Sequence, residues 1–144
     1  MISFNYESDF VLEDEASYSS WLSAVIRSEN KTEGDVNYVF CDDDYLHGLN
    51  VEYLNHDTLT DIISFDYSVG NELHGDIFIS VERVAENATE FGESFENELR
   101  RVMVHGILHY CGYADKTETD IELMRSKEDE KIIMFHVEQS DDDV

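Results

Sequence analysis

The chain has 144 residues, a length that fits one domain with its own hydrophobic core. Hydrophobic residues make up 42% of it, which excludes a disordered chain, and no run of about 18 apolar residues predicts a membrane span. Nine Lys and Arg against 34 Asp and Glu give a net charge of −25. Taken alone, this balance argues against tight nucleic-acid binding, because phosphate contacts need cationic side chains.

The N-terminus and the cysteines bear on the expected compartment. The first residues, "MISFNYESDF", have no basic segment followed by an apolar run, so we expect no secretory signal peptide. The two cysteines, Cys41 and Cys111, fit a reducing compartment better than a disulfide scaffold. We therefore expect a cytoplasmic protein without a membrane segment.

Hydrophobic spacing predicts alternating strands and helices in the first half of the chain. Residues 2–6 read as a short strand, and 17–30 have apolar residues at helical spacing. Residues 35–40 alternate apolar and polar side chains, as a half-buried strand does, and 42–55 look helical. Cys41 is expected to end the buried strand.

The second half begins with two strong strand segments, 61–68 and 74–80, around a turn at Gly70 and Asn71. This arrangement predicts a hairpin. Residues 81–92 then read as a helix that Gly92 closes.

Two further helices complete the chain. Ser94 has the character of an N-cap for a helix that runs to about Cys111. Thr117 with Asp120 resembles a capping box for a last helix over 118–136. The pattern predicts a single domain over residues 1–144 in which a sheet packs against helices, as an α+β or α/β sandwich. Of the two we favour α+β, with a four-stranded mixed sheet packed against about five helices.

His105 and His109 lie four residues apart on the predicted helix, so their imidazoles project from the same face. That spacing lets two imidazoles reach one metal ion. Gly112 can adopt positive φ just past the helix and turn the chain back, so that Asp115 returns its carboxylate to the same point. Two histidines and one carboxylate with an open fourth position are typical of catalytic zinc. The pattern predicts one zinc per chain, with these three residues as both ligands and catalytic residues.

The remaining histidines show no such grouping, and we interpret them as surface or strand-end residues: His47, His56, His74 and His136. A pair of histidines four apart also occurs by chance on polar helix faces. The prediction of a metal site therefore rests on the whole pattern rather than on the pair.

The spacing also approaches the zinc-peptidase signature H-E-x-x-H-x-x-G-x-x-H. Gly106 follows the first histidine, however, where peptidases have the glutamate that acts as general base. This difference disfavours a peptidase. A glycine in mid-helix costs about 1 kcal/mol relative to alanine, so we expect a neighbouring strand or the substrate to approach closely at Gly106.

Three sequence blocks resemble one known family. "HGILHYCGYAD" (105–115) resembles the motif H-G-x-L-H-x-x-G-Y-x-H of the YbeY family, the bacterial rRNA maturation endoribonucleases. "LNVEYLNHDTLTDIISF" (49–65) and "GDIFISVERVAENA" (75–88) resemble two further blocks of that family, in the same order and at similar spacing. The resemblance covers about residues 35–135.

The resemblance implies a metal-dependent, single-strand-specific endoribonuclease that matures the 3′ end of small-subunit rRNA and acts in ribosome assembly and quality control. The implied partners are the rRNA precursor and the ribosome or its proteins. The implied fold has a zincin-like metal helix beneath a cleft, with Asp61 and Ser64 near the mouth of that cleft. Ser64 is equally well explained as a strand residue, Phe65 is interpreted as structural, and Asp76 is expected to cap or hold a loop.

The chain departs from the family pattern at two positions. The third histidine of the family falls at Asp115, and carboxylate is a legitimate zinc ligand. The family's arginine, expected near the phosphate, falls at Leu54; Arg83, or Arg100 with Arg101, are candidate replacements. Because of Leu54 and the acidic charge, a non-catalytic assembly factor that keeps its zinc site stands as the alternative to the nuclease.

Overall fold

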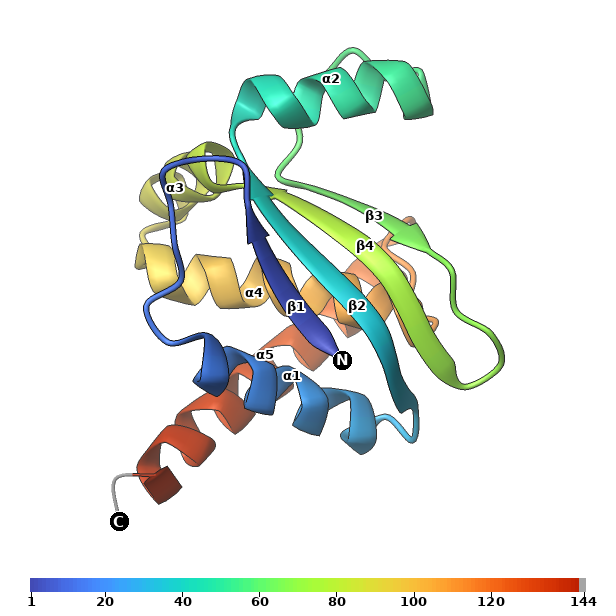
Figure 1. Cartoon of the computed structure of the whole chain (residues 1–144), viewed down its shortest axis with the longest axis vertical. Helices are drawn as coiled ribbons and strands as arrows, with labels where there is room; N and C mark the ends of the chain where they lie inside the picture. Colours follow the sequence, from blue (N-terminus) through green and yellow to red (C-terminus); the bar gives the residue numbers. More distant parts are fainter. Residues whose placement is uncertain (143–144) are drawn as a thin grey trace.

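The sheet has four strands, the number that the sequence predicts. A computed structural model describes residues 1–142, with side chains described through Val137. In this part of the chain the strands are β1 (Ile2–Tyr6), β2 (Thr32–Cys41), β3 (Ile62–Asp66) and β4 (Glu72–Ser80), in the order β1-β2-β4-β3 (Figure 1). β2 pairs in parallel with β1 and β4, whereas β3 and β4 form the predicted antiparallel hairpin. The sheet is therefore mixed.

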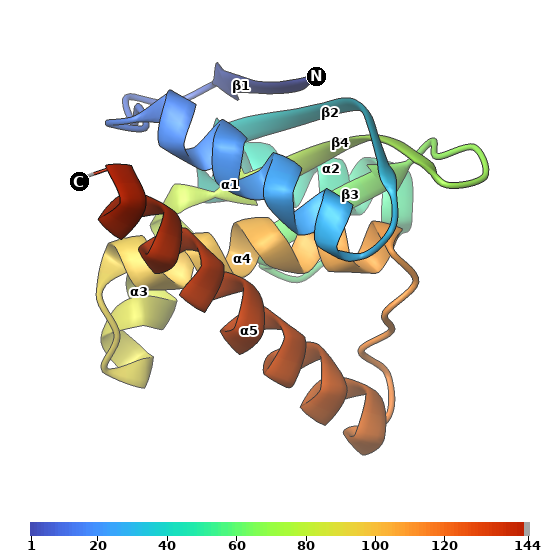
Figure 2. The same cartoon turned by 90° about the horizontal axis from the view of Figure 1, so that it is seen from below.

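Five helices accompany the sheet in the described residues: α1 (Glu15–Ser28), α2 (Asp43–Leu54), α3 (Val81–Phe91), α4 (Phe95–Tyr110) and α5 (Glu118–Asp142). Figures 1 and 2 show α1, α4 and α5 on one face of the sheet, with α3 beside α4. The α+β fold is thus confirmed. None of the described helices is long and apolar enough to cross a membrane.

Side chains that alternate along the central strands form the core beneath the sheet. Tyr38 of β2 and Ile77 of β4 point toward the helices and are fully buried, as are Trp21 and Leu22 of α1. A smaller cluster on the opposite face packs α2 against the sheet, and its buried members are Cys41, Leu46 and Ile63.

Local capping signals fix most helix ends. The Ser94 side chain accepts a hydrogen bond from the Asn97 N–H at 3.1 Å, and Gly92 ends α3 at φ +70°. Thr117 and Asp120 exchange the two hydrogen bonds of a capping box, at 3.3 and 3.1 Å. These three predictions are confirmed.

Several element ends differ from the prediction by two or more residues, and three have a bearing on the fold. Helix α1 begins at Glu15 rather than at 17, because the Asp14 carboxylate caps it by accepting from the Ser17 N–H at 3.2 Å. Strand β2 begins at Thr32 rather than at 35, because Thr32 pairs with Glu72 at the start of the long β4. Helix α5 continues to Asp142, beyond the predicted end at 136.

Gly106 lies where α4 passes closely over the sheet. A Cβ atom added to Gly106 would lie 2.9 Å from Cδ1 of Ile77 on β4 and 3.4 Å from Cδ1 of Ile62 on β3. Of the two predicted reasons for this glycine, the structure shows the approach of neighbouring strands. The helix that carries both histidines is thereby seated directly on the hairpin.

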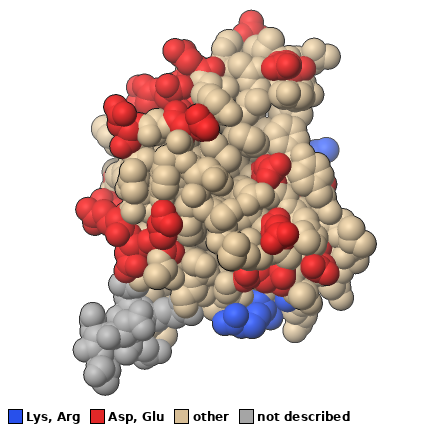
Figure 3. Space-filling view, viewed as in Figure 1, with Lys and Arg blue, Asp and Glu red and all other residues tan. Residues whose placement is uncertain are grey.

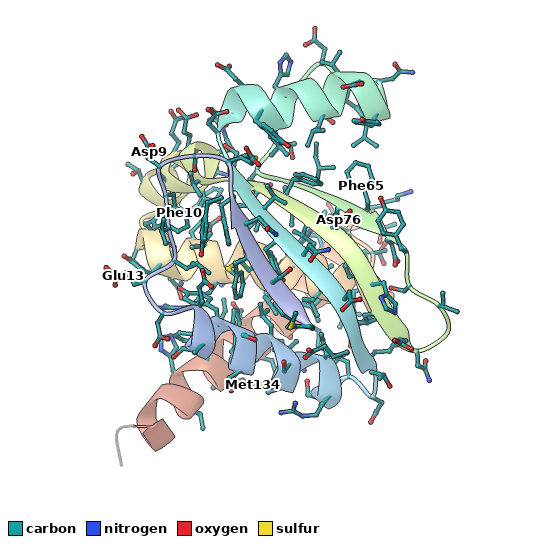
Figure 4. All side chains as sticks on the ribbon, in the orientation of Figure 1. Asp9, Phe10, Glu13, Phe65, Asp76 and Met134 are labelled. Atoms are coloured by element: carbon teal, nitrogen blue, oxygen red, sulfur yellow. The ribbon has the colours of Figure 1, made fainter. Side chains whose placement is uncertain are left out.

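The prediction for Asp76 was wrong. Asp76 lies within the predicted strand, β4, but its carboxylate accepts a hydrogen bond from the side-chain amide of Asn37 on the neighbouring strand β2, at 3.1 Å, instead of capping or holding a loop. It stands beside Phe65 on the face of the sheet opposite α4 (Figure 4). Phe65 is structural, as expected, because its ring packs 5.9 Å from that of Phe78.

We expect Gly75→Ala to lower the free energy of unfolding by about 3 kcal/mol, because overpacking a buried site forces neighbours to move. The added Cβ would lie 2.5 Å from the Phe65 carbonyl oxygen and 2.2 Å from the Tyr110 hydroxyl. Gly48→Ala is the matched control: nothing lies within 4 Å of its added Cβ, so helix propensity should stabilise the protein by about 0.5–1 kcal/mol. Urea unfolding of both variants tests this pair, and equal midpoints would contradict it.

Candidate metal centre

The turn after α4 brings the predicted carboxylate back toward the helix. Gly112 has φ +105°, and the Tyr113 N–H donates to the Leu108 carbonyl at 3.1 Å while the Gly112 N–H donates to that of His109 at 3.0 Å. This pair of bonds is a Schellman motif, in which the residue after the cap needs a left-handed conformation. The predicted role of Gly112 is confirmed.

His105, His109 and Asp115 converge on one point. Their ligand atoms all lie within 4.8 Å of one another. One carboxylate oxygen, Oδ2 of Asp115, lies 3.3 Å from Nε2 of His105 and 3.2 Å from Nε2 of His109. The two imidazole planes stand nearly perpendicular, at 86°. The three side chains are partly exposed, so a substrate can reach them.

The second nitrogen of each imidazole is already engaged. Nδ1 of His109 lies 2.9 Å from the Tyr113 carbonyl oxygen, and Nδ1 of His105 lies 2.7 Å from the carboxylate of Glu128. Both partners are acceptors, so each Nδ1 carries a hydrogen and each Nε2 is left as an electron-pair donor. Three electron-pair donors facing one point repel each other unless a proton or a cation lies between them. The arrangement fits a zinc ion with an open fourth position.

Glu128 is a functional residue that sequence reasoning missed. It lies on α5, 23 residues after His105, and is only 5% exposed. Its other oxygen accepts a hydrogen bond from Arg101 at 3.0 Å, and Arg101 also pairs with Asp129 at 2.7 Å. No spacing rule links α5 to α4, so only the packing of the two helices reveals the contact.

The surroundings shift several pKa values in and near the centre. Burial acts to lower the pKa of His105, but the hydrogen bond and charge of Glu128, with Asp115, outweigh burial and the pKa is raised. Burial raises the pKa of Asp61, and the charge of His105 partly opposes this. The pKa of Glu98 is also raised by burial. The surroundings therefore favour the charged form of His105 and disfavour the charged forms of the Asp61 and Glu98 carboxyls.

The three residues line a cleft of about 540 Å³. Asp61 and Ser64, predicted near its mouth, are both in its wall, and so is Phe91 at the end of α3. The other lining residues come from the segment before β3, from β3 and from α3, α4 and α5: Thr60, Ile62, Asn87, Glu98, Arg101, Val102, Ile121, Met124, Arg125 and Glu128.

Of the three arginines considered as replacements for the family's arginine, only one lines the cleft. Arg83 pairs with Asp43 at 2.8 Å, away from the cleft, and the Arg100 guanidinium lies 4.2 Å from the centre of the Phe135 ring. Arg101 lines the cleft. A second arginine of the cleft, Arg125 of α5, was not predicted.

The other histidines lie outside the cleft lining, as predicted. His47 contacts Asp57 at 2.7 Å and His74 contacts Glu72 at 3.0 Å, both near the surface. His56 is exposed in the segment after α2.

Comparisons with known proteins agree on one family. The sequence profile described as endoribonuclease YbeY matches residues 3–136. Proteins named endoribonuclease YbeY from Flavobacterium johnsoniae and Flavobacterium psychrophilum are 71% and 66% identical to the chain. These alignments cover 96% and 97% of the chain and 100% of each relative. The solution structure of TM1509 from Thermotoga maritima is similar in fold, with a TM-score of 0.72 at 26% identity over 99% of this chain and 93% of that one.

We expect Glu128→Gln to weaken zinc binding tenfold or more, because loss of a carboxylate partner to a ligating histidine costs about 10–100-fold in affinity. Asp129→Asn is the matched control, since Asp129 also pairs with Arg101 but has no contact to His105. Competition with a chromophoric chelator measures both affinities. Equal affinities in the two variants would show that Glu128 does not support the metal site.

Proposed function

The chain belongs to the endoribonuclease YbeY family, and we propose that it is a zinc-dependent endoribonuclease that cleaves single-stranded segments of rRNA precursors. The observation that carries this proposal is the convergence of His105, His109 and Asp115 in an open cleft. The names of the relatives supply the reaction class, hydrolysis of RNA. The ligand set of two histidines and one carboxylate favours zinc as the metal.

The chain's own residues have defined tasks in this proposal. Glu128 and the Tyr113 carbonyl hold the imidazoles so that both Nε2 atoms face Asp115. When bound, zinc acts as a Lewis acid and makes water nucleophilic at neutral pH. Asp115 in place of a histidine adds one negative charge, which lowers the net positive charge that a phosphate would meet.

The proton acceptor for hydrolysis must come from elsewhere than the position after His105, which is Gly106. Asp61 lies in the wall of the same cleft, and burial raises the pKa of its carboxyl. A carboxyl with a raised pKa is better matched to taking up a proton near neutral pH. Asp61 is the residue we would test first for this role.

The proposed substrate sets the location and the partners. The cytoplasm holds rRNA precursors, and we place the protein there, acting on the 3′ end of small-subunit rRNA together with the ribosome or its proteins. On the face shown in Figure 3, acidic side chains are spread widely, and Lys and Arg of the described residues appear only toward the rim. Such a surface suits a basic protein partner better than free RNA.

A non-catalytic assembly factor is the second candidate. Leu54 is 42% exposed at the end of α2 and supplies no cation, and the net charge of −25 opposes RNA binding. A zinc peptidase is a weaker candidate, because the position of its general base is occupied by Gly106. Cleavage assays with RNA and with peptide separate the three.

We expect one zinc per wild-type chain and none in His109→Ala or Asp115→Ala, because removing one of three protein ligands leaves too few to retain the ion. His56→Ala is the control, since it removes an exposed histidine outside the cleft. Elemental analysis after dialysis against a weak chelator gives the stoichiometry. A His109→Ala variant that keeps a full equivalent of zinc would rule out the ligand assignment.

We expect the zinc-loaded protein to cleave single-stranded RNA and His105→Ala to lose this activity to background, while His56→Ala keeps it. Cleavage of a labelled oligoribonucleotide followed on a denaturing gel measures the rate. If the wild type with one zinc per chain leaves RNA intact, the assembly-factor function replaces the nuclease. Peptide cleavage instead would point to the peptidase.

A further inference from the structure

The cleft around the metal centre is poor in cations for a site that would receive RNA. Four carboxylates line it, those of Asp61, Glu98, Asp115 and Glu128, against two arginines. Arg101 is already ion-paired within the protein, because its two terminal nitrogens bind Glu128 and Asp129, at 3.0 and 2.7 Å.

Arg125 is the other arginine and is differently placed. It is exposed, and none of the described residues forms an ion pair with it. Ile121, Arg125 and Glu128 all line the cleft, and their spacing of four and three residues puts them on one face of α5. Arg125 therefore lies about one helical turn from the carboxylate that holds His105, with its guanidinium available to a phosphate.

An exposed aromatic ring lines the same cleft. Phe91, at the end of α3, is 59% exposed, and Ile121 of α5 is 49% exposed. An exposed phenyl ring beside a hydrolytic site offers a flat apolar surface. Stacking of a base on such a ring tolerates any sequence, because every base has a π-face.

We propose that Arg125 and Phe91 together bind a nucleotide adjacent to the cleaved bond, with Arg125 contacting a phosphate and Phe91 stacking on the base. This inference rests on the proposed nuclease function for its substrate class. It makes a definite claim about geometry: the RNA strand enters between α3 and α5 rather than along the acidic outer face of the sheet. Both residues are substrate-binding residues, separate from the metal ligands.

The test uses two substitutions, each with a matched control. Arg125→Ala is compared with Arg27→Ala, which removes an exposed arginine at the end of α1 and changes the net charge equally. Phe91→Ala is compared with Tyr67→Ala, because Tyr67 is also 59% exposed and lies outside the cleft lining. Arg125→Lys and Phe91→Tyr serve as conservative variants that should restore part of the binding.

Two readouts are measured for every variant. The first is binding of a fluorescent single-stranded oligoribonucleotide, by anisotropy in EDTA at several salt concentrations. The second is cleavage of the same oligoribonucleotide by the zinc-loaded protein, with kcat and KM determined separately.

We expect Arg125→Ala and Phe91→Ala each to weaken RNA binding about tenfold, the size of one charged phosphate contact or one stacked base. The loss should appear mainly in KM, because both residues hold the substrate before and during the reaction. The slope of log affinity against log salt should change by about 0.7 for Arg125→Ala relative to Arg27→Ala, as expected for one lost phosphate contact on a single strand. Phe91→Ala should leave the slope unchanged.

The outcomes separate this inference from the proposed function. If the wild type cleaves RNA and Arg125→Ala behaves like Arg27→Ala, the inference is overturned and the nuclease stands. If the wild type binds RNA through Arg125 and Phe91 but does not cleave it, the assignment of these two residues as RNA-binding stands, and the nuclease function fails together with the placement beside a cleaved bond. If the wild type neither binds nor cleaves RNA, both fail.

Discussion

The hydrogen bond between Glu128 and His105 is the contact on which the geometry of the cleft depends. A buried carboxylate is costly unless charged or polar partners surround it, and Glu128 has two, His105 at 2.7 Å and Arg101 at 3.0 Å. The bond joins α5 to the helix that carries both histidines. It also directs Nε2 of His105 toward Asp115. One contact therefore both holds the two helices together and orients a candidate metal ligand.

His109 is oriented by a longer chain of contacts that leads to the same helix. Its Nδ1 donates to the Tyr113 carbonyl, and the Tyr113 hydroxyl donates to Glu29 at 2.6 Å. Glu29 in turn pairs with Lys131 of α5 at 2.9 Å. Helix α5 thus supports one imidazole directly and the other through the segment after α4. Folding of the C-terminal helix and formation of the metal centre are consequently coupled.

The predictions that succeeded depend on neighbours in sequence. The spacing of His105 and His109, the cap at Ser94 and the turn at Gly112 follow from helix geometry over a few residues, so sequence determines them locally. The resemblance of three sequence blocks to one family allowed the cleft, with Asp61 and Ser64 near its mouth, to be predicted as well. The prediction for Asp76 failed because the role of its side chain depends on Asn37, which lies beside it only through the pairing of β2 with β4.

Residues supplied by α5 to the cleft could not be predicted in the same way. Which face of α5 meets α4 is set by the path of the chain after Gly112 and by the packing of Met124 and Phe135, both buried. Glu128 and Arg125 therefore looked like two more charged residues on a polar helix. Their roles differ because Glu128 is buried against His105, whereas Arg125, three residues before it, stays exposed in the cleft.

The acidity of the chain affects long-range and short-range electrostatics differently. At physiological salt the Debye length is about 8 Å, so carboxylates scattered over the surface act weakly on a phosphate inside the cleft. They still remove the long-range attraction that speeds the approach of RNA to basic proteins. For the proposed nuclease, recognition would then come from contacts within the cleft, where the exposed guanidinium of Arg125 and the ring of Phe91 would act at short range. Such an acidic protein would gain its substrate by being brought to it, in agreement with the proposed action on an RNA already held in a ribosomal particle.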